Sequence, residues 1–273
     1  MVKSARLRLS DVRAVYRLIG ECREVGDDPI AWRTHLLEGA MRLAGARVGM
    51  CGELVLATNN YTNPQVALGW NDGQAAIWHD YLSAHVGKDD LFWDRVQNEA
   101  AMLQTVRRCD YVADDEWYGQ AYVDEGWRPA DVDRIILSGR MCRRAGPTLD
   151  GVILLRAWGE KRFTKRDQRL VRLLHDEIAP LVGGQLAAAH EPGPSGLSRR
   201  KREVLECLLE GDSDKFIALR LGISTATVSE YVTAIFRHFG VSSRAQLSAS
   251  FLRRFRRTRK QPRDVPAISK PVA

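Results

Sequence analysis

The feature that most constrains the fold of this chain is a short segment rich in proline and glycine, Glu191-Pro192-Gly193-Pro194-Ser195-Gly196. Proline and glycine interrupt helices and strands alike, so the segment predicts a linker between two folded units. All seven tryptophans precede residue 190, which supports the division. We therefore expect four parts in the 273-residue chain: a domain over 1–190, a linker over 191–196, a second domain over 197–257, and a flexible, basic, proline-containing tail over 258–273.

Charge divides at the same place. Residues 195–273 contain 16 Lys and Arg against 7 Asp and Glu, a net charge of +9, whereas residues 1–194 carry −2 and the whole chain +7. A short basic unit joined to a near-neutral body favours a polyanionic partner. The longest aliphatic run, Val152–Leu155, is far shorter than the roughly 18 apolar residues of a membrane span. Charges also occupy the N-terminal positions that a secretory peptide keeps apolar, so we expect a cytoplasmic protein with no membrane partner.

Cysteine and histidine spacing predicts neither a metal site nor a catalytic centre. The five cysteines have no CxxC spacing, the six histidines have no HExxH spacing, and the chain has neither a Walker loop nor a GxGxxG motif. We therefore expect no cofactor, no metal and no enzymatic activity.

Four helical segments, separated by residues that begin or end helices, are predicted within 197–257. The first carries apolar residues at helical spacing from Val204 to Leu209, and a short second helix follows Gly211. Gly222 can then adopt a left-handed turn, and Ser224 can cap a third helix that runs to about Phe239. The third helix has an inward stripe of Val228, Val232, Ile235 and Phe239, and the fourth has a packing face of Leu247, Phe251 and Phe255. Two helices joined by a tight glycine turn predict a helix-turn-helix.

Several short motifs of this unit resemble the LuxR-type DNA-binding domain. They are Leu197–Leu205, Gly211–Ala218, Leu221–Ser224, Thr227-Val228 and Phe239–Arg244. The resemblance implies an all-α four-helix domain whose third helix enters the major groove of double-stranded DNA. The residues assigned to DNA contact, in the helix-turn-helix at about 214–233 and its flank, are Lys215, Arg220, Thr225, Thr227, Ser229, Glu230, Thr233, Arg237 and Arg244.

Three positions depart from the LuxR-type pattern. Lys201 stands where the family usually has an acid, and Ser229 and Tyr231 stand where it often has Lys and His. The groove-facing helix is therefore less basic than usual, and we expect phosphate contacts from flanking bases, including the cluster Arg253–Lys260. Glu230 is either repelled by phosphates or accepts a hydrogen bond from a cytosine amino group, and both interpretations stay open.

The first domain is predicted to have an α+β fold, with helical layers around a largely antiparallel sheet. Predicted helices cover 10–24, 29–44, 75–85, 91–104, 114–126 and 164–189, and predicted strands cover 47–57, 65–70, 132–143 and 150–158. This order resembles the GAF/PAS-like sensor domains that precede LuxR-type domains. The motifs that carry the resemblance are Trp117–Tyr122, Trp127–Pro129, Gly151–Arg156 and Phe163–Asp167.

A weaker resemblance concerns acyl-homoserine-lactone receptors, whose pocket combines a Tyr, an Asp and tryptophans in this part of the domain. The residues that could form a ligand pocket here are Trp78, Tyr81, Asp89, Tyr118, Tyr122 and Trp127. The carboxylate would accept from a ligand amide, and the aromatic rings would cover an apolar tail. The spacing does not reproduce the receptor pattern, however, and the same aromatic residues also suit an ordinary core.

Together these features predict a dimeric, sequence-specific transcription regulator whose first domain senses a small-molecule or protein signal. The homodimer is expected to form through the predicted helix 164–189, with Leu170, Leu174, Ile178 and Leu181 on one stripe, or through the fourth helix of the second unit. Pro180 and Gly183-Gly184 are expected to act as a hinge. A ligand-free dimerisation or protein-interaction module is the alternative for the first domain, and an enzyme domain fused to a DNA-binding unit is the weaker one.

Overall fold

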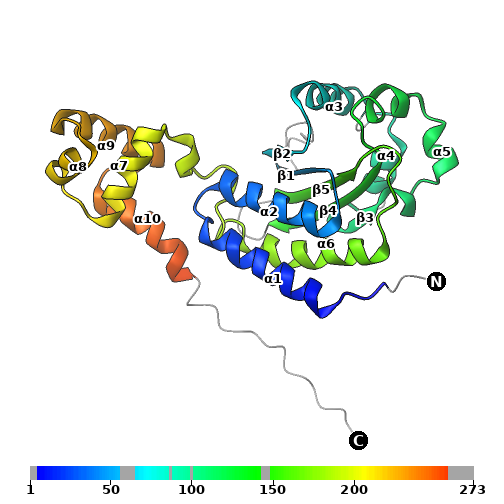
Figure 1. The fold of residues 1–273 in the computed structure, drawn as a ribbon, viewed down its shortest axis with the longest axis horizontal. Helices are drawn as coiled ribbons and strands as arrows, with labels where there is room; N and C mark the ends of the chain where they lie inside the picture. Colours follow the sequence, from blue (N-terminus) through cyan, green and yellow to red (C-terminus); the bar gives the residue numbers. More distant parts are fainter. Residues whose placement is uncertain (1–4, 56–64, 86–87, 99–100, 143–147, 258–273) are drawn as a thin grey trace, which may run out of the picture. The chain divides into compact units, whose positions relative to one another are not determined.

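The computed structural model describes residues 5–55, 65–85, 88–98, 101–142 and 148–257 (Figure 1). The chain divides between Ser198 and Arg199 into two compact units. The predicted tail, 258–273, lies outside the described residues. Within the described ranges, none of the helices combines the length and the apolar character that a membrane crossing requires.

The first unit is built on a five-stranded antiparallel sheet with the strand order β2-β1-β5-β4-β3. The strands are β1 (Val48–Val55), β2 (Val66–Leu68), β3 (Thr105–Arg107), β4 (Arg134–Cys142) and β5 (Thr148–Arg156). The long central strands pair β4 with β5 in a register that sets Gly139 opposite Gly151. The predicted combination of an antiparallel sheet with helical layers is confirmed.

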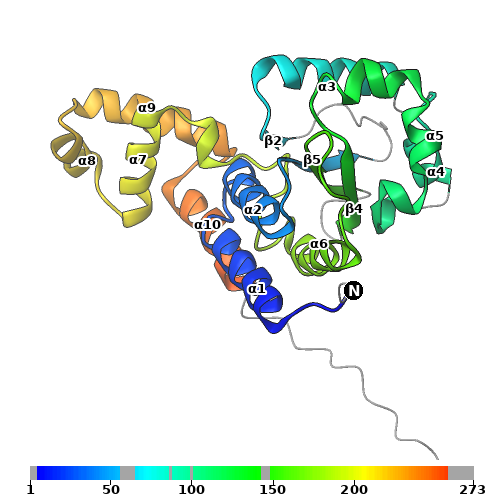
Figure 2. The same ribbon diagram turned by 45° about the vertical axis from the view of Figure 1, so that its right-hand side comes forward.

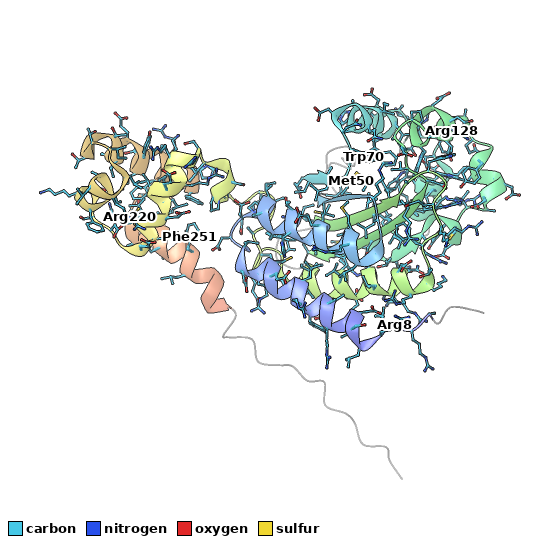
Figure 3. The ribbon with its side chains drawn as sticks, viewed as in Figure 1. Arg8, Met50, Trp70, Arg128, Arg220 and Phe251 are labelled. Atoms are coloured by element: carbon cyan, nitrogen blue, oxygen red, sulfur yellow. The ribbon has the colours of Figure 1, made fainter. Side chains whose placement is uncertain are left out.

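Helices cover both faces of this sheet (Figures 1 and 2). One face carries α1 (Leu9–Glu24), α2 (Pro29–Ala44) and α6 (Lys165–Ile178), and the other carries α3 (Asp72–His85), α4 (Leu91–Asn98) and α5 (Asp114–Tyr118). Side chains alternate along each strand, so neighbouring residues belong to different cores. Cys51 packs with α1, α2 and α6, whereas Met50 packs with Trp70 in the opposite core (Figure 3).

The prediction of one long helix over 164–189 is wrong, because α6 ends at Ile178. Pro180 cannot donate an amide hydrogen bond to a continuing helix, and Gly183 adopts a left-handed φ of 71°. A 3-10 turn, Ala179–Leu181, replaces the next helical turn. The stripe expected to pair two subunits is used inside the unit: Leu170, Leu174 and Ile178 are all buried in the core beneath the sheet.

Other element boundaries also differ from the predictions. The helix predicted over 114–126 stops at Tyr118, and a separate π-helical turn, Val123–Trp127, follows. The helix predicted over 91–104 stops at Asn98. Strand β3 is not visible in the sequence, because its three residues are too few to show an alternating pattern.

The second unit consists of α7 (Arg199–Glu210), α8 (Asp214–Leu221), α9 (Thr225–Phe239) and α10 (Arg244–Arg257), as predicted. Its turns follow from local chemistry. Gly222 adopts φ 64° at the C-terminal end of α8, and the Ser224 hydroxyl accepts from the amide of Thr227 at a distance of 3.0 Å to cap α9. The buried core is formed by Val204, Leu205, Leu208, Ile217, Val228, Ile235 and Leu247.

Candidate functional site

Helix α9 separates a buried stripe from an exposed polar face. Val228 and Ile235 are fully buried against the other helices of the second unit. The exposed residues on the opposite side of the helix are Thr225, Ser229, Glu230, Thr233 and Arg237. A capped turn that presents such a face from its second helix defines a helix-turn-helix, whose exposed face is the one that meets base edges.

The hydroxyls predicted to contact DNA differ in the hydrogen bonds that they make within the protein. Thr227 Oγ1 lies 2.9 Å from Ser224 Oγ, so this side chain belongs to the cap of α9. Thr233 Oγ1 donates to the carbonyl of Ser229 at 2.9 Å, which leaves its lone pairs free to accept. The structure describes no hydrogen bond for the Thr225 or Ser229 hydroxyl.

The four predicted phosphate-binding cations fall into two pairs. Lys215 and Arg237 are exposed, and neither forms an ion pair within the part of the chain that the structure describes. Arg220 instead pairs with Glu210, whose pKa it lowers, and with Asp212 at 3.0 Å (Figure 3). Arg244 pairs with Asp214. The predicted basic cluster Arg253–Lys260 is described only as the backbone of α10 up to Arg257.

In the first unit, four of the six predicted pocket residues meet in one buried aromatic cluster between the sheet and α3. The rings of Trp78 and Trp127 lie 4.9 Å apart and those of Trp78 and Tyr81 lie 5.0 Å apart. Tyr122 joins the same core with its ring 6.4 Å from that of Tyr81, and Trp117, not among the predicted residues, lies 4.8 Å from Trp127. Direct ring contacts therefore fill much of the region in which a pocket was predicted.

The other two predicted residues lie outside this aromatic cluster. The side chain of Asp89 is 62% exposed and accepts from His85 Nδ1 at 2.9 Å. Tyr118 packs its ring on Trp158 and donates its hydroxyl to Asp133 at 2.8 Å.

The carboxylate of the aromatic cluster belongs to Asp90, which sequence reasoning missed. Asp90 is fully buried and accepts from the amides of Phe92 at 2.8 Å and Trp93 at 2.9 Å, and it also accepts from the Tyr81 hydroxyl. Burial raises the pKa of Asp90 to about 6, although these hydrogen bonds oppose the rise. The available signal was its position directly before α4, where an Asp caps the helix.

Three indole N–H groups of this core, those of Trp78, Trp93 and Trp117, are buried and have no hydrogen-bond partner among the described residues. The buried indole of Trp127 interacts with the Tyr81 hydroxyl. A buried donor without a partner costs about 1–3 kcal/mol, and native proteins contain few such groups. The aromatic cluster therefore combines unsatisfied donors with one buried carboxylate.

The unusual environment of Asp90 predicts a pH effect on stability. Its pKa of about 6 in the folded state exceeds the ordinary 3.8, so the folded state binds the proton more tightly, and stability falls as pH rises from about 4 to about 6. The size is about 3 kcal/mol, at about 1.4 kcal/mol per pKa unit. Asp90→Asn should remove this slope, because asparagine still caps a helix but does not ionise.

The measurement is urea unfolding of wild type and Asp90→Asn at intervals between pH 4 and pH 7, followed by tryptophan fluorescence. The difference between the two proteins isolates Asp90 from acids such as Asp28 and Asp110, whose lowered pKa values act below pH 4. Parallel pH profiles of the two proteins would contradict the prediction.

The sequence analysis also did not predict a buried polar network on the other face of the sheet. His175 lies 3.1 Å from Asp150 through Nε2 and 2.8 Å from Ser138 through Nδ1. These are the residue types of a hydrolytic triad, but all three side chains are at most 1% exposed. A substrate has no access to them, so the network supports the fold. Among the described residues, no group of His, Cys, Asp or Glu is placed to hold a metal ion.

Arg33 extends this network to the end of the first unit. Its fully buried guanidinium pairs with Glu53 and lies 3.6 Å from Asp150. It also donates to the carbonyl of Ala187 at 3.4 Å, and Glu53 accepts from the amide of Ala189 at 2.8 Å. Arg33 and Glu53 therefore hold the segment that leads into the predicted linker.

The comparison with protein families agrees with the geometry of the second unit. Residues 195–251 match the family described as "Bacterial regulatory proteins, luxR family". The second unit is a LuxR-family helix-turn-helix domain. A curated relative, the transcriptional regulatory protein FixJ of Azorhizobium caulinodans, is 51% identical over 51 residues, which cover 18% of this chain and 24% of FixJ. The chain thus matches about a quarter of the length of this relative.

Two solved structures have detectable similarity to long stretches of this chain. SdiA of Escherichia coli is 16% identical with a TM-score of 0.34, over 83% of this chain and 91% of SdiA. The LBD domain of VqsR from Pseudomonas aeruginosa is 16% identical with a TM-score of 0.44, over 61% of this chain and 92% of that domain.

Proposed function

We propose that this protein is a sequence-specific transcription regulator that binds double-stranded DNA through α9. The observation that carries the proposal is the exposed polar face of α9 in a domain of the LuxR family, together with Lys215 and Arg237, which form no ion pair among the described residues. Thr225, Ser229 and Thr233 offer hydroxyls to base edges, and the two cations reach the phosphates. Arg220, Arg244 and Thr227 act within the domain.

The test is fluorescence anisotropy of the full chain with labelled duplexes between 50 and 300 mM NaCl. A DNA-binding protein gives a linear fall of log K with log salt concentration, because each neutralised phosphate releases counterions. Selection from a random duplex pool then tests for sequence preference. The absence of any salt-sensitive binding would remove the proposal.

We propose further that the first unit is a GAF/PAS-like sensor domain that controls the second in a homodimer. The buried stripe of α6 is occupied by its own core, so α10, with Leu252 about half exposed, is the better dimerisation element. The signal would bind at the aromatic cluster. Asp90 would accept a hydrogen bond from the ligand, and the Trp78 indole, which has no partner among the described residues, would donate to a carbonyl oxygen of the ligand.

One observation favours the alternative of a ligand-free dimerisation or protein-interaction module: the rings of the aromatic cluster already contact one another. Thermal unfolding of the full chain in a small-molecule extract of cells separates the two. A sensor domain is stabilised by the extract, and Asp90→Asn loses that stabilisation. No shift in wild type, together with a tightly co-purifying protein, supports the module instead.

A further inference from the structure

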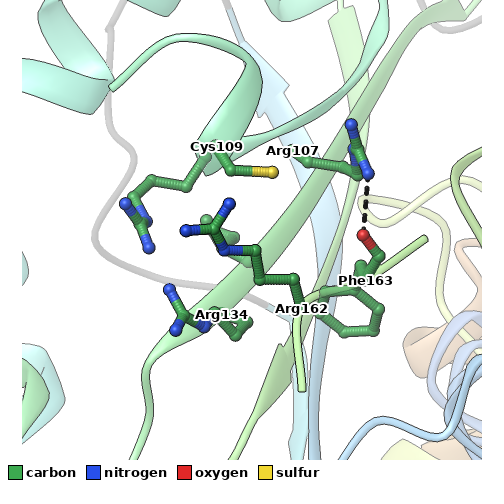
Figure 4. A pocket seen from close by; sticks show the side chains of 7 residues that line it. Arg107, Cys109, Arg134, Arg162 and Phe163 are labelled. Atoms are coloured by element: carbon green, nitrogen blue, oxygen red, sulfur yellow. Dashed lines mark hydrogen bonds between the residues drawn. The ribbon is translucent and has the colours of Figure 1, made fainter. Parts of the chain in front are cut away.

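A second candidate site lies in the first unit where β3 ends, β4 begins and the chain enters α6. A small hollow at this place is lined by four arginines and a cysteine, together with two apolar side chains (Figure 4). The lining residues are Arg107, Arg108, Cys109, Arg134, Ile135, Arg162 and Phe163. Arg107 is fixed by donating to the carbonyl of Phe163 at 2.8 Å. None of these residues was among the predicted DNA-contacting or ligand-pocket residues.

Three of the arginines meet on one carboxylate, that of Asp114. Arg108 donates to it at 2.7 Å and Arg134 at 3.2 Å, and Arg162 pairs with its second oxygen. Burial acts to raise the pKa of Asp114, but the hydrogen bonds from Arg108 and Arg162 outweigh burial, and the pKa is lowered. Asp114 is thus ionised and already neutralises part of the positive charge around the hollow.

The negative charge supplied by the protein is nevertheless too small to balance the cations. The four arginines and Lys165 carry five positive charges, and their carboxylate partners are Asp110, Asp114 and Asp133. Five cations against three anions leave a net charge of +2. Excess positive charge in a concave, partly buried place attracts an anion more strongly than the same charge on an open surface.

Arg108 supplies an independent sign of an incomplete site. Its side chain is 1% exposed and packs over the ring of Trp117. Its two terminal nitrogens donate to Val112 and Asp114, but its Nε is buried and has no hydrogen-bond partner among the described residues. A guanidinium donates through three nitrogens, and Nε is the one nitrogen of Arg108 that makes no hydrogen bond with the described residues.

We propose that this hollow binds a small oxyanion, the carboxylate or phosphate group of a low-molecular-weight solute. The hollow has room for about one water-sized molecule, which is smaller than a carboxylate or phosphate group, so its lining must open to admit one. Arg162, whose side chain is 56% exposed, can move outward from Asp114 to admit that group. Planar guanidinium groups match the geometry of carboxylates and phosphates. This site adjoins the aromatic cluster through the contact of Arg108 with Trp117, but the proposal does not depend on the proposed sensing function.

Cys109 provides a built-in reporter for occupancy. It is the only one of the five cysteines that is not buried, and it lines the hollow. Burial raises the pKa of Cys22 and Cys142 to about 12, which makes these thiols unreactive. An anion held by the arginines should shield the Cys109 sulfur from a small neutral alkylating reagent.

The experiment measures the alkylation rate of Cys109 by iodoacetamide in the full chain at pH 7.5, read by peptide mass spectrometry. Inorganic phosphate and acetate are tested at up to 10 mM, with NaCl holding the ionic strength constant. We expect at least a fivefold slowing by phosphate, and a similar effect of acetate if the carboxylate group is also accepted. Arg162→Gln should reduce the protection to less than twofold.

The matched control is Arg128→Gln, which also removes one cation from the first unit. Arg128 is 57% exposed, pairs with one carboxylate, Asp124, and does not line the hollow. This variant should keep the full protection. Unchanged rates with both anions, or undiminished protection in Arg162→Gln, would overturn the proposal. Titration calorimetry with phosphate does not depend on the thiol, and an absence of binding heat would overturn it as well.

Discussion

Replacing Arg33 with methionine is expected to lower the free energy of unfolding of the first unit by about 3–5 kcal/mol. The substitution keeps an unbranched apolar stem but removes the guanidinium, and it leaves Glu53 and Asp150 buried without this cation. Removing one partner of a buried ion pair lowers stability by much more than the pair as a whole contributes, because the remaining charge stays buried away from water. Arg33 is fully buried and also packs over the ring of Trp32 at 4.0 Å.

The distribution of tryptophan makes this measurement specific. All seven tryptophans precede residue 190, so tryptophan fluorescence during urea unfolding follows the first unit alone. Arg42→Met is the control, because Arg42 is an exposed arginine on the same helix, and we expect a change within about 0.5 kcal/mol. A loss below about 1 kcal/mol in Arg33→Met would show that the network adds little to the fold.

A second readout tests whether Arg33 holds the chain leading to the linker. Its contact with Ala187, and that of Glu53 with Ala189, should be lost or weakened in Arg33→Met. Amide hydrogen exchange at 187–190 should then become faster under conditions in which the sheet amides stay protected. Unchanged exchange at these positions would limit the role of Arg33 to the core.

The second unit was predictable because its signals are local. Gly222 directly follows α8, which it ends, and Ser224 directly precedes α9, which it caps. The apolar stripe from Val228 to Phe239 repeats at helical spacing. The buried networks of the first unit are different. Arg33 meets Ala187 across 154 positions and His175 meets Ser138 across 37, and no local pattern encodes such pairs. An isolated arginine or histidine in a sequence suggests the surface, which is where most such residues lie.

Asp89, a predicted pocket residue, and Asp90 are neighbours in sequence, yet their side chains have different surroundings. Asp89 is exposed beside His85, and Asp90 is buried with Tyr81. Composition and spacing do not separate them, because only the start of α4 decides which carboxylate turns inward. The helix predicted to continue past Ile178 ends there for a local reason, because Pro180 has no amide hydrogen to donate to a continuing helix.

The largest effect on DNA binding is expected from the double variant Lys215→Gln/Arg237→Gln. If each cation neutralises one phosphate, the salt slope of log K falls in magnitude by about 1.8, and the affinity at 150 mM salt falls about 30-fold. Both side chains are exposed and form no ion pair within the described residues, so the fold should not change. The measurement is anisotropy of the full chain with a labelled duplex across a salt series.

Arg220→Gln and Arg244→Gln provide the contrast, because sequence reasoning gave all four cations the same role. Arg220 joins the end of α7 to the following loop through Glu210 and Asp212, and Arg244 ties the start of α10 to Asp214. We expect both variants to keep the wild-type salt slope but to show faster amide exchange over 211–221. If these two variants lowered the slope and the double variant did not, the cations that face DNA would be the paired ones, and the orientation of α9 proposed above would be wrong.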